Sequence, residues 1–180
     1  MKKETKTKIK NFTHDVIDIF LSIPESFIGA FDRKEFYRVL QGMPTEKILT
    51  CSNICKVFNN LKQQGYIDVQ KLSEGNESIV FTNKAKLAIV DRIVSRIMDG
   101  NEYCLVSFDI PEKLKNNRNR FRRAIKRMGF RQIQKSLWVS NKRLGDLVDL
   151  AAAEYQVSDY VVYFISSSTN IDDHINFLLK

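Results

Sequence analysis

The C-terminal half of the chain switches repeatedly between strand-like and helix-like apolar patterns, and these switches constrain the fold more than any other feature. Residues 103–110 form a largely apolar run that a proline ends, which is typical of a buried strand. Residues 112–128 then repeat apolar side chains at helical spacing, with Lys and Arg on the remaining faces. Residues 130–139 return to strand formers, but Gln134-Lys135-Ser136 interrupts them, so a bulge or a tight turn could divide this strand in two.

A second helix and a last strand complete this pattern. Residues 144–155 again place apolar side chains at helical spacing, and residues 160–165 are rich in strand formers. A short terminal helix begins near Asn170. The predicted order is β-α-β-β-α-β, which is the plan of a ferredoxin-like domain.

Three helices are predicted in the N-terminal half. The first covers residues 9–23, where apolar side chains recur at steps of three and four until a proline follows. The second covers residues 32–42, with Asp32 and Glu35 at capping-box spacing. The third covers residues 52–64 and has one apolar face, with a glycine after its last turn.

A β-hairpin and a closing helix follow the three helices. Residues 66–69 and 79–81 are short strand-like runs on either side of a Gly/Asn turn. A helix capped by Thr82 or Asn83 then continues to about residue 97. This order is that of a winged helix-turn-helix. An all-helical adaptor unit with an incidental hairpin is the alternative.

The turn residues Asp99-Gly100-Asn101 mark the predicted domain boundary. We therefore expect an α+β chain: a winged helix-turn-helix over residues 1–100, with a basic N-terminal tail, followed by a ferredoxin-like (βαββαβ) domain over residues 101–180. No run of 18 apolar residues is present, and the first ten residues lack the apolar core of a signal peptide. A cytoplasmic location is expected.

The net charge of +8 is unevenly distributed. Residues 113–143 hold twelve Lys or Arg and no acidic residue, whereas residues 144–180 hold six acidic residues and one Lys. A surface this basic attracts a polyanion, because binding releases the counterions condensed on it. The cations could therefore bind nucleic acid, or they could pair with the acidic segment of a neighbouring protomer.

An ordered set of motifs in the second half resembles a known family. Phe108-Asp109-Ile110-Pro111-Glu112 comes first, followed by Arg118, Arg122-Arg123, Met128-Gly129-Phe130 and the run Gln132 to Val139. This set is similar to the C-terminal half of PaaX-like transcriptional regulators, which itself resembles the "Cas two" endonuclease family of CRISPR adaptation. The resemblance implies an N-terminal winged helix that binds operator DNA, a dimerising ferredoxin-like domain and regulation by a small ligand.

Candidate DNA contacts lie in both halves. In a winged helix the third helix enters the major groove, where Asn and Gln can bind adenine and Lys can reach guanine or phosphate. The polar side chains of the predicted third helix are Ser52, Asn53, Lys56, Asn59, Asn60 and Gln63. Further phosphate contacts are expected from Lys71 on the wing, from Lys2, Lys3, Lys6, Lys8 and Lys10, and from Arg122, Arg123, Lys126 and Arg127.

Asp109 is the candidate for an enzymatic alternative. The resembling nucleases place a metal-binding aspartate at this position, and a magnesium site there would need a second carboxylate from a symmetry mate. The more economical interpretation is that Asp109 accepts backbone hydrogen bonds at the strand-helix turn. Cys51 and Cys55 share a helix face without a second pair of ligands, so they predict packing rather than zinc. Trp138 is expected in the core or in a dimer interface.

These observations together favour a homodimeric, non-enzymatic regulator, a repressor, that binds double-stranded DNA. No cofactor is expected, and an effector is not identified. The alternative is a magnesium-dependent endonuclease or a subunit of a CRISPR adaptation or defence complex.

Overall fold

The computed structural model describes residues 12–21, 33–42, 51–71, 77–95, 97 and 102–180, with the side chains of residues 33, 35, 51–53 and 95 left out. By its internal contacts the chain divides into two compact units, Met1–Ile89 and Val90–Lys180. Both contain helices and antiparallel strands. The division falls about ten residues before Asp99-Gly100-Asn101, and all three of those residues lie outside the described ones.

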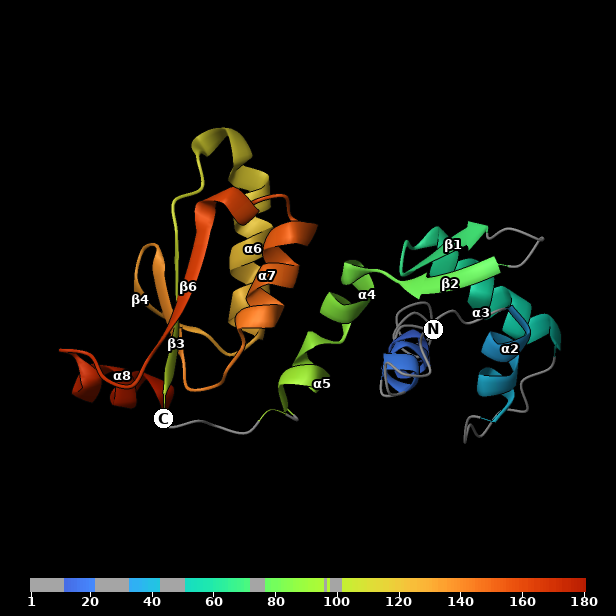
Figure 1. The fold of residues 1–180 in the computed structure, drawn as a ribbon, viewed down its shortest axis with the longest axis horizontal. Helices are drawn as coiled ribbons and strands as arrows, with labels where there is room; N and C mark the ends of the chain where they lie inside the picture. The colour runs from blue at the N-terminus through green and yellow to red at the C-terminus, as the bar shows by residue number, and fades with distance from the viewer. Residues whose placement is uncertain (1–11, 22–32, 43–50, 72–76, 96, 98–101) are drawn as a thin grey trace, which may run out of the picture. The chain divides into compact units, whose positions relative to one another are not determined.

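The first unit contains helices followed by a hairpin (Figure 1). A helix over residues 12–21 comes first. The other elements are α2 (Arg33–Gln41), α3 (Cys51–Gln63), β1 (Ile67–Lys71), β2 (Glu77–Phe81) and α4 (Asn83–Ala88). β1 and β2 are antiparallel, with Ile67 opposite Phe81 and Lys71 opposite Glu77.

Stacked aromatic rings form the centre of this unit. Phe20 of the first described helix stacks on Phe36 of α2 at 4.6 Å between ring centroids. Phe36 meets Phe58 of α3 edge-on at 5.5 Å, and Phe20 also contacts Phe81 of β2. Because one ring cluster joins three helices and the hairpin, the apolar face of α3 is turned inward and its other faces are left to the surface.

The predicted closing helix is in fact two helices, α4 and α5 (Val90–Ser95). At Ile89 the backbone leaves helical geometry, with φ −110° and ψ 17°, and its N–H donates to Lys86 O at 3.3 Å, three residues back. The prediction of a single helix was wrong because Ile89, Val90 and Val94 are all buried and continue the apolar spacing across the break. Periodicity does not detect a break that keeps both sides apolar.

The second unit is built on a four-stranded antiparallel sheet with strand order β4-β5-β3-β6. Its strands are β3 (Tyr103–Phe108), β4 (Arg131–Gln134), β5 (Leu137–Ser140) and β6 (Val161–Ser166). Its helices after α5 are η3 (Glu112–Leu114), α6 (Lys115–Arg127), α7 (Gly145–Glu154), η4 (Ser158–Tyr160) and α8 (Asp172–Leu179). Residues 135–136 form a turn and the register shifts between Gln132 and Gln134, so the interrupted strand is divided as predicted.

Helices cover the two faces of this sheet unequally. α6 and α7 lie side by side against one face, and α8 lies at one end of the other (Figure 1). Ile175 of α8 packs on Leu105 and Val139. At the start of α7, a Cβ on Gly145 would come within 2.4 Å of the Tyr163 ring, so any side chain here would have to displace that ring.

Two cations of the second unit fasten α5 to the rest of it. Arg127 at the end of α6 donates through Nε and Nη2 to Asp91 Oδ2, at 3.2 and 2.6 Å. Lys142 Nζ, after β5, donates to the backbone carbonyls of Val94 and Ile97, at 3.3 and 2.5 Å. A cation at the C-terminal end of a helix satisfies carbonyls that have no partner within the helix.

Candidate nucleic-acid interface

α3 has the division of faces that the sequence predicted. Ile54, Phe58 and Leu61 are buried, whereas Lys56 and Asn59 are exposed. Gln63 is also exposed at the end of the helix. The side chains of Ser52 and Asn53, although inside the helix, lie outside the described residues. The described part of α3 therefore exposes two cations, Lys56 and Lys62, and two amides.

Asn60 differs from the other polar residues of α3. It is half-buried, and its Oδ1 accepts a hydrogen bond from Gln64 Nε2 at 2.7 Å. A bidentate contact with adenine needs both the amide oxygen and the amide nitrogen. Asn59, which is exposed, meets that requirement better than Asn60.

The C-terminal end of α3 is held by the residues that follow the hairpin. Gly65 has φ +68°, a left-handed conformation that favours glycine, and its carbonyl accepts from Thr82 Oγ1 at 2.7 Å. Lys84 Nζ donates to Gln64 O at 2.7 Å. Thr82 Oγ1 also accepts from Ala85 N at 3.3 Å, which makes Thr82 the N-cap of α4, one of the two predicted capping residues. This arrangement fixes α3 to the base of the hairpin.

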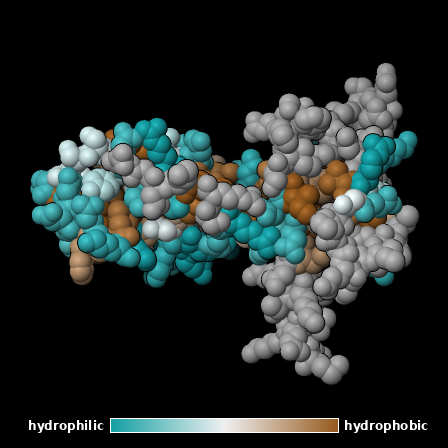
Figure 2. All heavy atoms as spheres, turned by 90° about the horizontal axis from the view of Figure 1, so that it is seen from below, coloured by the Kyte–Doolittle hydropathy of each residue, from teal (hydrophilic) through white to brown (hydrophobic). Residues whose placement is uncertain are grey.

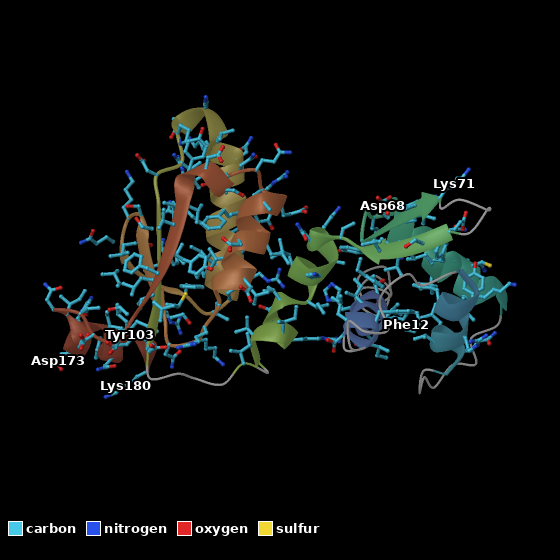
Figure 3. The ribbon with its side chains drawn as sticks, viewed as in Figure 1. Phe12, Asp68, Lys71, Tyr103, Asp173 and Lys180 are labelled. Carbon is cyan, nitrogen blue, oxygen red and sulfur yellow. The ribbon has the colours of Figure 1, made fainter. Side chains whose placement is uncertain are left out.

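Lys71 ends β1 and is exposed, at the end of the hairpin away from α4 (Figure 3). The predicted tip of the wing, residues 72–76, lies outside the described residues. The same is true of Lys2, Lys3, Lys6, Lys8 and Lys10. Lys71 is thus the one predicted phosphate contact of the first unit, outside α3, whose position the structure gives.

Several cations of the basic segment 113–143 form ion pairs, although the segment itself contains no acidic residue. Four of its cations are ion-paired in the described part of the chain, with acids just outside the segment or far from it. Lys115 and Arg118 pair with Glu112 at 3.4 and 2.7 Å, Arg127 pairs with Asp91, and Arg143 pairs with Glu102. The absence of an acid within the segment did not reveal these partners, because folding brings them from other elements.

The remaining cations of α6 border a hollow. Asn119, Arg122, Arg123 and Lys126 on α6 and Trp138 on β5 line a space of about 440 Å³ that is open to solvent. Arg122 donates to Lys135 O at 3.0 Å, and Arg123 Nε donates to Asn119 O at 3.2 Å. Four cations of α6 were predicted to hold phosphate. The structure gathers Arg122, Arg123 and Lys126 at this hollow, whereas Arg127 pairs with Asp91. We call this space the α6 groove.

Trp138 forms the apolar part of the α6 groove. The side chain is 6 % exposed, and its Nε1 has no hydrogen-bond partner among the described residues. The expectation of a core position is therefore confirmed, but nothing in the amino-acid pattern indicated that the ring also borders a cationic hollow. Only the register of β5 beneath α6 brings the two together.

The enzymatic alternative depends on Asp109, which would need a second carboxylate from another protomer. Asp109 is exposed after β3, and its backbone N–H donates to Tyr160 O at 3.0 Å. The nearby Glu112 is occupied by Arg118 and Lys115, and the hydrogen bond from Arg118 is the main cause that lowers the pKa of Glu112. No group of three potential metal ligands occurs in the described part of the chain.

The cysteines whose side chains are described differ in exposure. Cys55 on α3 is exposed and lies 3.4 Å from the Tyr37 hydroxyl. Cys104 on β3 is buried, and burial raises the pKa of its thiol. The side chain of Cys51 lies outside the described residues.

The two edges of the sheet in the second unit differ in character. β4 carries Arg131 and glutamines and has a register shift, whereas β6 has the uncharged sequence VVYFIS. Val162 and Phe164 on β6 are 64 % and 46 % exposed. On the face seen in Figure 2, hydrophilic residues cover most of the second unit and apolar side chains appear in small patches. The apolar edge at β6 was not predicted from the sequence.

Comparison with known proteins agrees with the resemblance carried by the motifs. Residues 98–177 match the family model described as the PaaX protein central Cas2-like domain. The second unit is similar to this PaaX domain. The PaaX-type match covers the whole sheet of the second unit and does not extend to α3 or the hairpin. No curated protein and no solved structure matches the chain. None of the helices in the described segments is long and apolar enough to cross a membrane.

Proposed function

We propose that the protein is a PaaX-type transcriptional regulator, a dimeric repressor that binds double-stranded DNA without catalysing a reaction on it. The observation that carries the proposal is the combination of the PaaX central domain with a preceding helical unit whose α3 has a polar outer face. The cytoplasm is the location in which such a regulator would meet DNA.

The order of elements supports a more specific assignment of both units. Three helices, a two-stranded hairpin and a further helix are the elements of a winged helix-turn-helix, with β1 and β2 as the wing. In the second unit, the order of strands across the sheet, numbered along this unit, is second, third, first, fourth. A β-α-β-β-α-β chain with that antiparallel order is a ferredoxin-like domain.

In this proposal α3 reads sequence and the cations outside it hold the backbone. Asn59 and Gln63 would contact base edges and Lys56 guanine or phosphate, with Ser52, Asn53 and Asn60 next to them on the same helix. Lys71 on the wing and Arg122, Arg123 and Lys126 on α6 would contact phosphates. Arg127 contributes less, because its guanidinium is already bound to Asp91.

Exposed β6 is the surface that we propose for dimerisation. An edge strand offers unpaired N–H and C=O groups, and proteins that stay monomeric protect such edges with charges, prolines or bulges. β4 has a charge and a register shift, but β6 has neither. Pairing with a second copy would also cover Val162 and Phe164.

Base reading by α3 is tested by comparing two neighbouring asparagines. A binding site is first selected from randomised duplex DNA, and affinities for it and for a scrambled duplex are measured by fluorescence anisotropy. We expect Asn59→Ala to lose about 1–3 kcal/mol of specific affinity, the value of one bidentate base contact. Asn60→Ala should lose less, because Gln64 already occupies its Oδ1.

The outcomes of this comparison differ clearly. A loss confined to the selected site in Asn59→Ala supports reading by α3. If no sequence is enriched, or if both variants bind the selected site as the wild type does, the proposed DNA-reading function is wrong.

Dimerisation is tested by light scattering on Val162→Lys, with Arg131→Glu on the opposite edge as the matched control. A wild-type dimer that only Val162→Lys dissociates supports pairing at β6. A wild-type monomer at micromolar concentration, or dissociation by the control alone, contradicts it.

A further inference from the structure

The α6 groove has the composition of a site for a small anion. Arg122, Arg123 and Lys126 border it from one helix, and in the described part of the chain none of the three is paired with a carboxylate. Asn119 adds an amide at the same rim. Three positive charges on one side of a hollow lower the energy of an anion there, and the effect is greatest for an anion with more than one negative charge.

Two of these cations are held in place before any ligand binds. Arg122 is half-buried and donates to Lys135 O, and Arg123 donates through Nε to Asn119 O. Each of these bonds uses one donor of a guanidinium that has five. The others are left for a ligand, and a planar guanidinium recognises phosphate oxygens in pairs.

Trp138 supplies an independent indication of a ligand. Its indole N–H is buried, and no described residue accepts a hydrogen bond from it. Buried donors in proteins nearly always have a partner, and one without a protein partner points to a bound water or ion. Trp138 lines the same hollow as the three cations.

We propose that the α6 groove is a binding site for a phosphate dianion, either free phosphate or the terminal phosphate of a small phosphomonoester. Its volume of about 440 Å³ accommodates such a group with part of the molecule that carries it. The same three cations are proposed above as contacts of the DNA backbone, so a small phosphate dianion in the groove would compete with DNA for them.

Trp138 is the only tryptophan of the chain, so its fluorescence reports on the groove without any label. The full-length protein is titrated with inorganic phosphate and, separately, with a nucleoside monophosphate, against sodium chloride at equal ionic strength. We expect a saturable change in fluorescence with phosphate that chloride does not produce. Tighter binding of the monophosphate than of free phosphate would identify a phosphomonoester as the better ligand; equal affinity would identify the phosphate group alone.

Variants locate the site. Arg123→Gln and Lys126→Gln should each weaken binding about tenfold, the loss of one charge-assisted contact. Arg120→Gln is the matched control, because Arg120 is an exposed cation of the same helix that does not line the groove. It should bind as the wild type does. Circular dichroism checks that all three variants are folded.

Three results would overturn the proposal: no saturable change with either phosphate compound, an equal loss of affinity in Arg120→Gln, or a response to duplex DNA alone. The last result would assign the groove to the DNA backbone. None of these measurements depends on sequence reading by α3. A negative phosphate titration therefore does not affect the Asn59→Ala test, and a negative Asn59→Ala test does not affect the proposed phosphate site.

Discussion

The cations of α6 give the DNA-binding proposal its most quantitative test. Arg123 and Lys126 are exposed and have no carboxylate partner in the described part of the chain, whereas Arg127 is bound to Asp91 by two donors. If the first two each contact one phosphate, replacing both with glutamine removes two contacts. The plot of log affinity against log salt has a negative slope, and its steepness should then decrease by about 1.8, at about 0.9 for each phosphate contact. At 0.1 M salt this corresponds to roughly 60-fold weaker binding.

The assay is fluorescence anisotropy with a labelled duplex of arbitrary sequence, over roughly 50 to 200 mM salt. Arg127→Gln serves as the control of equal charge change. It should lower the slope by much less than 0.9, because its guanidinium already compensates Asp91. An unchanged slope in the double variant would refute phosphate contact by α6. If that variant also lost the dimer in light scattering, the cations would belong to the interface between protomers.

Three further predictions concern stability and reactivity. Thr82→Val removes the N-cap of α4 and the donor to Gly65 O, so it should lower the free energy of unfolding in urea by about 1–2 kcal/mol, while Thr82→Ser should stay near wild type; equal stability of both variants would contradict the capping role. Gly145→Ala should cost about 1–3 kcal/mol, because the new Cβ meets the Tyr163 ring, and Tyr163→Leu should restore part of that loss in thermal unfolding. At pH 8, mapping of labelled peptides should show that Cys55 reacts with thiol reagents faster than Cys104, because burial raises the pKa of Cys104 and keeps it protonated; the opposite order would contradict its burial.

Elements of both units were predictable because their signals are local. The change from helical to alternating spacing at Gly65, and again at Gly129, locates elements that the structure contains. Both glycines have positive φ, which explains why the chain uses them where helices end. The helix break at Ile89 could not be predicted, because buried residues on both sides of it preserve the period.

The candidate site was only partly predictable from sequence. The outward face of α3 follows from its apolar spacing, but the bond from Gln64 to Asn60 depends on which rotamers the helix end allows. Asp91 lies 36 residues before its partner Arg127, and no local pattern connects them. The position of Trp138 beside the α6 cations depends on strand register, which is a tertiary property.

The two-point attachment of α5 matters for anyone who divides this chain into fragments. The family match begins at residue 98, and a fragment cut there would lose α5 and leave Arg127 without Asp91 and Lys142 without the carbonyls of Val94 and Ile97. A fragment that begins at Val90 keeps all three contacts. In this protein the smallest piece that retains its own internal ion pairs is therefore longer than the segment that matches the family model, and α5 belongs to that piece although it follows α4 almost without interruption.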